Sequence, residues 1–158
     1  MNDIRAHIIS ELSKIVVENI VIIDWGCGND RNKAQRYIHH KDCEIITVDI
    51  KADRLPSLVA DIYQPLTIKE ADLAFCLEVL EHCYNPDIAL DNIYNNLKTG
   101  STLYLSVPFV DRVHGMPDYW RYTRLGIITL LERHKFKIIR VVNKKFGERI
   151  EYFVEAIK

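Results

Sequence analysis

The segment NIVIIDWGCG, residues 19–28, constrains the fold most, because an apolar strand runs directly into a glycine-containing turn. The four apolar or β-branched residues at 20–23 and the following Asp24 are typical of a strand that is buried on both faces. Gly26 and Gly28 allow backbone conformations that other residues avoid, and they allow the backbone to approach a ligand closely. The segment therefore predicts a ligand-binding turn at the carboxyl end of a parallel strand.

The rest of the chain alternates between helical and strand-like apolar patterns. We expect helices over residues 4–17, 31–40 and 86–98, and another that ends near His134; Gly100 is expected to end the third. Buried strands are expected at 19–24, 43–50 and 71–80, a short strand at 57–61 and a further strand at 101–109. A final pair of strands turns near Lys145 and Gly147. This order predicts an α/β fold, a Rossmann-like three-layer sandwich with a mostly parallel seven-stranded sheet and a C-terminal antiparallel hairpin.

Composition narrows the class of protein. The 158 residues, 48% hydrophobic and 27% charged, suit a single domain over 1–158. A net charge of -1 argues against a protein that coats nucleic acid, and neither a membrane-spanning run nor a signal peptide is seen, so a cytoplasmic location without membrane attachment is expected. The four cysteines form no C-x-x-C pair and are expected to be reduced. Zinc binding by Cys76, His82 and Cys83 is disfavoured, and no metal site is predicted.

Residues 110–149 are rich in positive charge. They contain ten Lys or Arg residues and four acidic residues, a local net charge of +6. An ordinary solvated surface explains this excess more simply than an anion-binding site, because several of these side chains fall on opposite sides of their elements. Both interpretations stay open.

An acidic residue also ends the second buried strand. Asp49 lies 25 residues after Asp24, where a carboxylate can accept hydrogen bonds from both hydroxyls of an adenosine ribose. A polar strand end without a ligand is the alternative. The glycine pattern alone is weak, because Asp30 and Arg31 stand where the dinucleotide-binding pattern G-x-G-x-x-G requires its last glycine.

Several segments together resemble one family over the whole chain. VIIDWGCGN resembles motif I of the class I S-adenosylmethionine-dependent methyltransferases, TVDI resembles their ribose-binding strand end, and DLAFCLEVLEH resembles the segment around their fourth strand. VPFVDRVHGMPDYWRYT is similar to the loop after strand five in type-11-like methyltransferases, many of which are small enzymes. The terminal hairpin is also a feature of this family.

The resemblance implies S-adenosylmethionine as cofactor and a place for each of its parts. Asp24, Gly26 and Gly28 are then expected at the methionine end, Asp49 and Ile50 at the ribose, Asp61 and Ile62 at the adenine, and Leu77 and Glu78 beside the sulfonium. Asn29 or Asp30 replaces the third small residue of motif I, and Asp30 is also suited to cap the following helix.

Because the cofactor carries an activated methyl group, the enzyme mainly has to position an acceptor and, where needed, remove a proton. His82 and His114 are candidate bases, and His114 and Tyr119 are expected to face the methyl group. Arg121 suits an acidic or phosphorylated substrate. The predicted substrate contacts are Phe109, Trp120, Arg121 and Tyr122. The alternative is a packed loop whose aromatic rings only cover the end of the sheet.

The predicted function is therefore methyl transfer to an O or N atom of a small molecule. Neither an N-P-P-Y motif nor a Pro-Cys pair follows the fourth strand, which argues against methylation of a base amino group or of cytosine C5. A nicotinamide-dependent oxidoreductase is disfavoured by the glycine pattern and the terminal hairpin. A non-catalytic S-adenosylmethionine-binding adaptor stays open, as does a homodimer or a partner subunit that completes the substrate site.

Overall fold

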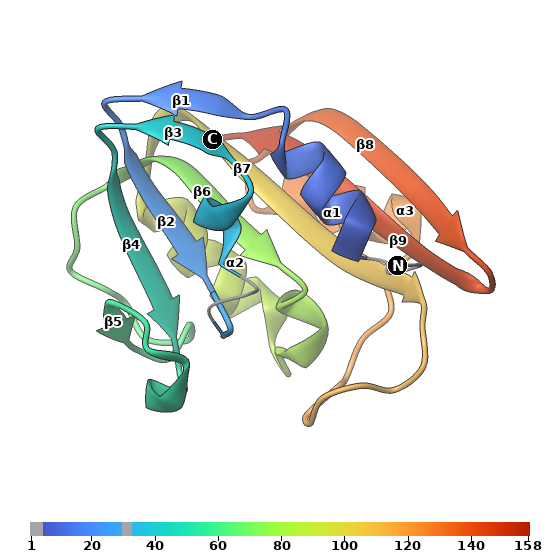
Figure 1. Ribbon diagram of the computed structural model, residues 1–158. Coiled ribbons are helices and arrows are strands. Elements are labelled where there is room, and N and C mark those ends of the chain that lie inside the picture. The colour runs from blue at the N-terminus through green and yellow to red at the C-terminus, as the bar shows by residue number, and fades with distance from the viewer. Residues whose placement is uncertain (1–4, 30–32) are drawn as a thin grey trace.

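Seven strands form one sheet in the order β5-β4-β2-β6-β7-β9-β8 (Figure 1). The computed structural model describes residues 5–29 and 33–158. In this order, β5, β4, β2, β6 and β7 pair in parallel with their neighbours. β9 pairs antiparallel with both β7 and β8. The strands are β2 (Val21–Trp25), β4 (Glu44–Asp49), β5 (Leu58–Val59), β6 (Ala71–Leu77), β7 (Leu97–Val110), β8 (Lys137–Phe146) and β9 (Arg149–Ile157). The predicted mostly parallel sheet with a terminal antiparallel hairpin is confirmed.

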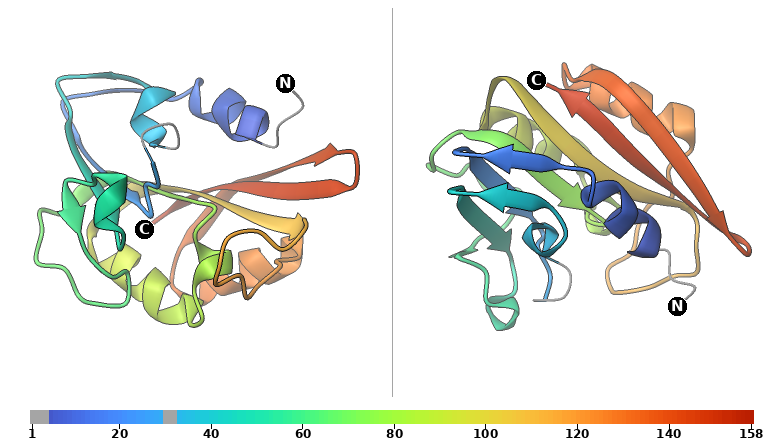
Figure 2. Two further views of the ribbon diagram at one scale, coloured as in Figure 1. Left: turned by 60° about the horizontal axis from the view of Figure 1, so that its bottom comes forward. Right: turned by 45° about the horizontal axis from the view of Figure 1, so that its top comes forward.

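Helices cover both faces of this sheet (Figure 2). One face carries α2 and α3, and the other carries α1 and the short turn η1. Strands β1 and β3 form a separate parallel pair. The elements outside the sheet are α1 (Arg5–Leu12), β1 (Val16–Glu18), η1 (Ala34–Arg36), β3 (His39–Lys41), η2 (Ala52–Arg54), η3 (Leu80–His82), α2 (Pro86–Asn95) and α3 (Arg124–Arg133).

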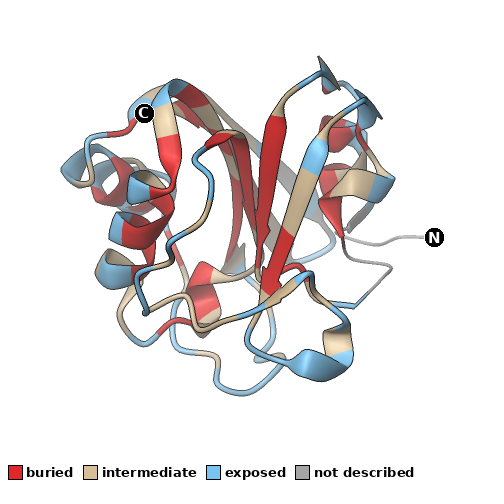
Figure 3. Ribbon diagram, turned by 90° about the vertical axis from the view of Figure 1, so that its left-hand side faces the viewer, coloured by how far each residue is buried: buried red, intermediate tan, exposed pale blue. Residues whose placement is uncertain are grey.

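The core is divided by the sheet into two clusters, and Figure 3 shows the buried strands between partly exposed outer layers. The larger cluster joins Trp25 and Cys76 to apolar residues of α2 and α3, such as Leu90 and Leu131. The smaller one joins Phe75 and other strand residues to α1 and η1. These three layers confirm the predicted sandwich.

Local signals start the two longer helices. The Asn85 side chain accepts a hydrogen bond from Ile88 N at 3.4 Å, and Pro86 occupies the first helical position of α2. Thr123 caps α3 in the same way through Gly126 N at 3.0 Å. These caps fix where α2 and α3 begin. Each of these helices follows a segment that lines the cavity described below.

Two expected helices differ from the structure. The first ends at Leu12 rather than at residue 17, because the chain leaves the helix to pair β1 with β3. The expectation of a helix over 31–40 is wrong for its described part: residues 34–36 form a single 3-10 turn and His39 begins a strand. Residues 31 and 32 lie outside the described part of the chain.

Two element ends also differ. Gly100 has a φ of 82° within β7 and does not end a helix; α2 ends at Asn95. The strand expected over 71–80 ends at Leu77, because Glu78 takes a left-handed conformation with φ 55°. All four cysteines are free, as expected. In the described part of the chain, no helix has the length and apolar character needed to cross a membrane.

Candidate active site

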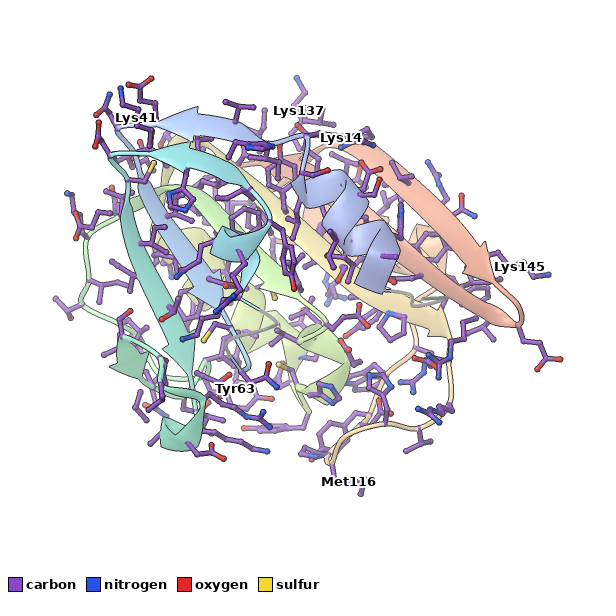
Figure 4. All side chains as sticks on the ribbon, viewed as in Figure 1. Lys14, Lys41, Tyr63, Met116, Lys137 and Lys145 are labelled. Carbon is purple, nitrogen blue, oxygen red and sulfur yellow. The ribbon has the colours of Figure 1, made fainter. Side chains whose placement is uncertain are left out.

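One cavity of about 800 Å³ opens at the carboxyl ends of β2, β4 and β6. Its walls come from segments 24–28, 48–51, 60–63, 77–79 and 82–84, from residues between Asp111 and Tyr119, and from α1. Figure 4 labels two of the lining residues, Tyr63 on the connection after β5 and Met116 on the loop after β7, both at the end of the molecule to which these strands point. The cavity lies where parallel α/β sheets bind their ligands.

The turn after β2 forms one wall and has the backbone that the sequence predicted. Gly26 and Gly28 have φ values of 62° and 63°. A Cβ atom on Gly26 would lie 2.5 Å from Cγ2 of Val79, so only glycine fits there without a shift of its neighbours. The amide of Gly28 donates to Oδ2 of Asp49 at 2.9 Å. The acid at the end of β4 therefore holds the glycine turn and also lines the cavity.

Asp24 is a buried acid at the end of β2. Its side chain accepts a hydrogen bond from Ala34 N at 2.8 Å, which ties η1 to the strand. Burial raises the pKa of Asp24 from 3.8 to about 7, although the Ala34 hydrogen bond and the charge of Lys33 act in the opposite direction. Such a carboxyl is stabilised in its charged form by a nearby cation. Asp30, proposed above as a helix cap, lies outside the described residues.

Glu78 follows directly after β6, and its backbone conformation is strained. Its left-handed φ of 55° is uncommon outside glycine and asparagine, and such conformations gather at functional sites. Ser106 of β7 donates to Oε1 of Glu78 at 2.9 Å. Burial and the neighbouring Glu81 raise the pKa of Glu78 from 4.5 to about 8, so its neutral form predominates at neutral pH.

The loop after β7 brings two histidines together on the far side of the cavity. The ring centroids of His82 and His114 lie 5.4 Å apart. Nε2 of each ring lies 3.7 Å from Oε1 of Glu81, which is fully buried. The nearby Glu81 carboxylate raises the pKa of His114 from 6.5 to about 9, although burial acts in the opposite direction. This environment favours the protonated form of His114.

The predicted site residues divide into two groups. All twelve of the predicted cofactor-binding and catalytic residues line the cavity: Asp24, Gly26, Gly28, Asp49, Ile50, Asp61, Ile62, Leu77, Glu78, His82, His114 and Tyr119. The four predicted substrate contacts, Phe109, Trp120, Arg121 and Tyr122, are not among the described residues that line it.

Each of these four residues has a contact elsewhere. Phe109 packs on Tyr152 with ring centroids 6.0 Å apart. The Trp120 ring donates to Cys83 O at 2.7 Å, and the buried Tyr122 hydroxyl donates to Leu80 O at 3.2 Å. Arg121 pairs with Asp118 at 2.6 and 2.8 Å and donates to backbone carbonyls. Trp120 and Tyr122 hold the loop against η3 and Cys83, Phe109 packs on β9, and Arg121 pairs within the loop. The alternative of a packed loop therefore accounts for these four side chains.

Sequence reasoning missed Arg112 and Arg149, which line the cavity, and the buried Glu81 beside the two histidines. The three-residue spacing of Glu78 and Glu81 before His82 was a signal, but the burial of Glu81 was not visible in it. Tyr119 and Trp120 donate their amides to the Glu81 carbonyl at 2.7 and 3.2 Å, so a distant loop covers this residue.

With this geometry established, comparisons with known proteins assign the family. A family model described as a methyltransferase domain matches residues 3–139. The chain belongs to this family. The prediction of a class I S-adenosylmethionine-dependent methyltransferase is confirmed. The predicted cofactor, S-adenosylmethionine, is confirmed with it. No curated protein matches the chain.

Solved structures share the fold of this methyltransferase at low identity. The 1,6-didemethyltoxoflavin-N1-methyltransferase of Burkholderia thailandensis, bound to 1,6-didemethyltoxoflavin and S-adenosylhomocysteine, is similar at TM-score 0.75 and 17% identity, over 95% of this chain and 77% of that one. The N-methyltransferase NodS of Bradyrhizobium japonicum gives 0.67 and 17%, over 98% and 94%. The [4+2]-cyclase SpnF gives 0.77 and 14%, over 96% and 80%, so the same fold also serves a different reaction.

Proposed function

We propose that this methyltransferase binds S-adenosylmethionine in the cavity described above and transfers its methyl group to an O or N atom of a small molecule. The observation that carries the proposal is the convergence, in one cavity, of the glycine turn after β2 with acids at the ends of β2, β4 and β6. These acids are Asp24, Asp49 and Glu78, and the resemblance to the methyltransferase family implied a place at the cofactor for all three.

The residues present fit such a cofactor. A cavity of about 800 Å³ is large enough for a ligand of this size, since small-molecule sites span roughly 300–1,000 Å³. Gly26 has no room for a side chain and so lets the backbone approach a ligand. Asp24 offers a buried carboxyl to the cationic methionine end, and Asp49 can accept hydrogen bonds from ribose hydroxyls while it holds Gly28.

The bound cofactor supplies a methyl group that its sulfonium already activates, so the task of the protein is positioning. Leu77 and Ile62 exclude water on the cofactor side. The loop from Asp111 to Tyr119 forms the acceptor side, where His114 and Tyr119 orient the acceptor. Arg112 and Arg149 also line the cavity and favour an acidic or phosphorylated acceptor. The 1,6-didemethyltoxoflavin bound to the similar Burkholderia methyltransferase supports a small-molecule acceptor.

Calorimetry with S-adenosylhomocysteine, S-adenosylmethionine and NAD tests the cofactor. Asp49→Ala should weaken S-adenosylhomocysteine binding by about 1.5 to 3 kcal/mol, roughly 10- to 100-fold, because charge-assisted hydrogen bonds are lost. Asp49→Asn should recover part of this loss, since its side-chain oxygen can still accept from Gly28 N. Asp53→Ala, an exposed acid on η2, is the matched control and should bind like the wild type.

Equal affinity of wild type and Asp49→Ala would remove Asp49 from the ribose site, and tighter binding of NAD would contradict the cofactor itself. Turnover is then measured with radiolabelled S-adenosylmethionine and a panel of small phenols, amines and carboxylates. Tight cofactor binding without methyl transfer to any member of a wide panel would favour the adaptor alternative.

A further inference from the structure

A cluster of three potential metal ligands lies on the acceptor side of the cavity: His82 and His114 line the cavity, and the buried Glu81 lies beside both. Glu81 and His82 come from η3, and His114 comes from the loop after β7. One ligand atom from each residue lies within 4.8 Å of the other two. Oε1 of Glu81 is 3.7 Å from Nε2 of His82 and 3.7 Å from Nε2 of His114. Both separations are too long for hydrogen bonds.

Glu81 is the unusual member of this cluster. Its side chain is 0% exposed, and neither carboxylate oxygen has a hydrogen-bond partner among the described residues. Buried carboxylates are ordinarily held by several donors, because removing a charge from water without such partners costs several kcal/mol or more. A buried acid that faces two imidazole nitrogens at nearly 4 Å therefore indicates a missing partner between them.

The two rings are turned so that Nε2 is the atom facing Glu81. Nδ1 of His82 lies 2.6 Å from the carbonyl oxygen of Pro117, and Nδ1 of His114 lies 3.1 Å from that of Arg112. Because a carbonyl only accepts, each Nδ1 carries a hydrogen, and each Nε2 is the atom able to offer a lone pair. Backbone carbonyls commonly orient metal-binding histidines in this way.

We propose that Glu81, His82 and His114 bind a divalent transition-metal ion on the acceptor side of the cavity. Ligands held about 2.0 to 2.1 Å from a tetrahedral zinc ion lie about 3.4 Å from one another, so the two Glu81–histidine separations of 3.7 Å need to close by only a few tenths of an ångström. The two histidine ligand atoms lie within 4.8 Å of each other and need to close by about 1.4 Å at most. Two imidazoles with one carboxylate favour Zn²⁺, Co²⁺ or Mn²⁺ over Mg²⁺ and Ca²⁺.

This inference goes beyond the methyl transfer proposed above and does not depend on it. It replaces the expectation from the sequence that no metal is bound, and it gives His82 and His114 a shared role as ligands. Three protein ligands leave coordination positions open. Because His82 and His114 line the cavity, a hydroxyl or carboxylate oxygen of an acceptor bound there could occupy such a position. A metal here would therefore select oxygen-bearing acceptors and orient them.

The test is metal binding to the full chain after dialysis against EDTA. Calorimetric titration with ZnCl₂, MnCl₂, CoCl₂ and MgCl₂ should show binding of Zn²⁺ with a Kd below about 10 µM and weaker binding of Mg²⁺. Co²⁺ should give the intense visible absorption of a four- or five-coordinate site. Glu81→Gln and His114→Gln should each weaken Zn²⁺ binding by about 10²-fold or more. His39→Gln, an exposed histidine on β3, is the matched control and should change nothing.

Absence of Zn²⁺ binding below about 10 µM would overturn the proposal, as would equal affinity in the site variants or loss of binding in His39→Gln. If Glu81→Gln fails to fold, as judged by circular dichroism, His82→Gln and His114→Gln carry the same test. Asp49→Ala should keep the metal affinity of the wild type. A wild type that binds Zn²⁺ but not S-adenosylhomocysteine would contradict the proposed function and leave the metal site standing.

Discussion

Asp24 couples the stability of the fold to pH. Its pKa rises from 3.8 to about 7 because the folded protein buries it, so the folded state binds more protons than the unfolded chain between about pH 4 and 7. The stability that Asp24 contributes is therefore fully present below about pH 4 and is lost as the pH rises through about 7. Asp24→Asn should remove this dependence and keep an oxygen that accepts from Ala34 N.

The free energy of urea unfolding, measured for both proteins from pH 4 to 8, checks this. The wild type should lose stability relative to Asp24→Asn by about 1 kcal/mol per pH unit in that window. Asp72→Asn is the control of opposite sign, because Lys98 and Val21 N help to lower the pKa of Asp72 and its contribution is constant well above pH 4. A constant difference between wild type and Asp24→Asn would mean that folding does not shift the pKa of Asp24.

At the scale of single residues, the sequence predicted the location of a side chain where that location follows from the end of a strand. Asp49 was expected at the end of its strand, and parallel strands bring their carboxyl ends to one edge of the sheet, so its place follows from the strand pattern. The places of Asp24 and Glu78 at the cofactor were implied by the resemblance to the methyltransferase family. Glu81 could not be predicted as buried, since a loop more than thirty residues away covers it. The substrate role of Arg121 likewise depended on Asp118, which pairs with it only when the loop folds.

Among the elements, the turn after β2 makes a prediction with its own control. Gly26→Ala places a residue at φ 62° and a Cβ 2.5 Å from Val79, whereas Gly147→Ala, in the β8–β9 turn, places one at φ 58° with nothing within 4 Å. Both lose roughly 1 to 2 kcal/mol from the left-handed backbone. Gly26→Ala should lose about 1 to 3 kcal/mol more, from the steric conflict with Val79.

Urea unfolding of the two variants measures this difference, and Val79→Ala in the Gly26→Ala background should recover most of the additional loss. Gly26→Ala should also weaken S-adenosylhomocysteine binding, while Gly147→Ala should not. Equal losses of stability in the two glycine variants would mean that the turn accommodates a side chain.

Elements whose ends depend on distant pairing were the ones that the sequence misplaced. The apolar spacing of residues 4–17 is helical, but Val16 and Val17 pair with His39 and His40, and this pairing ends the helix early. The strands of the sheet and the terminal hairpin were predictable because their apolar runs and turn residues are local signals. The end of β6 was not, because the left-handed Glu78 depends on contacts with β7.

At the scale of the whole molecule, the helices on the two faces of the sheet pack on core clusters of different size. This difference predicts which segments the cofactor protects from amide hydrogen exchange. α2 and α3 pack on the larger cluster, away from the cavity. α1 packs on the smaller cluster, and Ile8, Ile9 and Leu12 line the cavity together with Tyr37. Segments with few buried contacts open at a lower free energy than the central strands. We therefore expect α1 and residues 33–38 to exchange their amide hydrogens faster than β6, β7 and β9.

S-adenosylhomocysteine should slow this exchange, because a ligand that contacts α1 and Tyr37 stabilises their closed state, by about 2.7 kcal/mol at a concentration 100 times its Kd. Native-state hydrogen exchange, followed by mass spectrometry with and without the ligand, measures the effect. α2 and α3 are internal controls, since no described residue of either helix lines the cavity. Protection confined to α2 and α3, with α1 unchanged, would place the ligand outside this cavity. Protection of α1 together with the glycine turn would instead link cofactor binding to the face of the sheet that carries the smaller core cluster. The bound cofactor would then add packing contacts for α1.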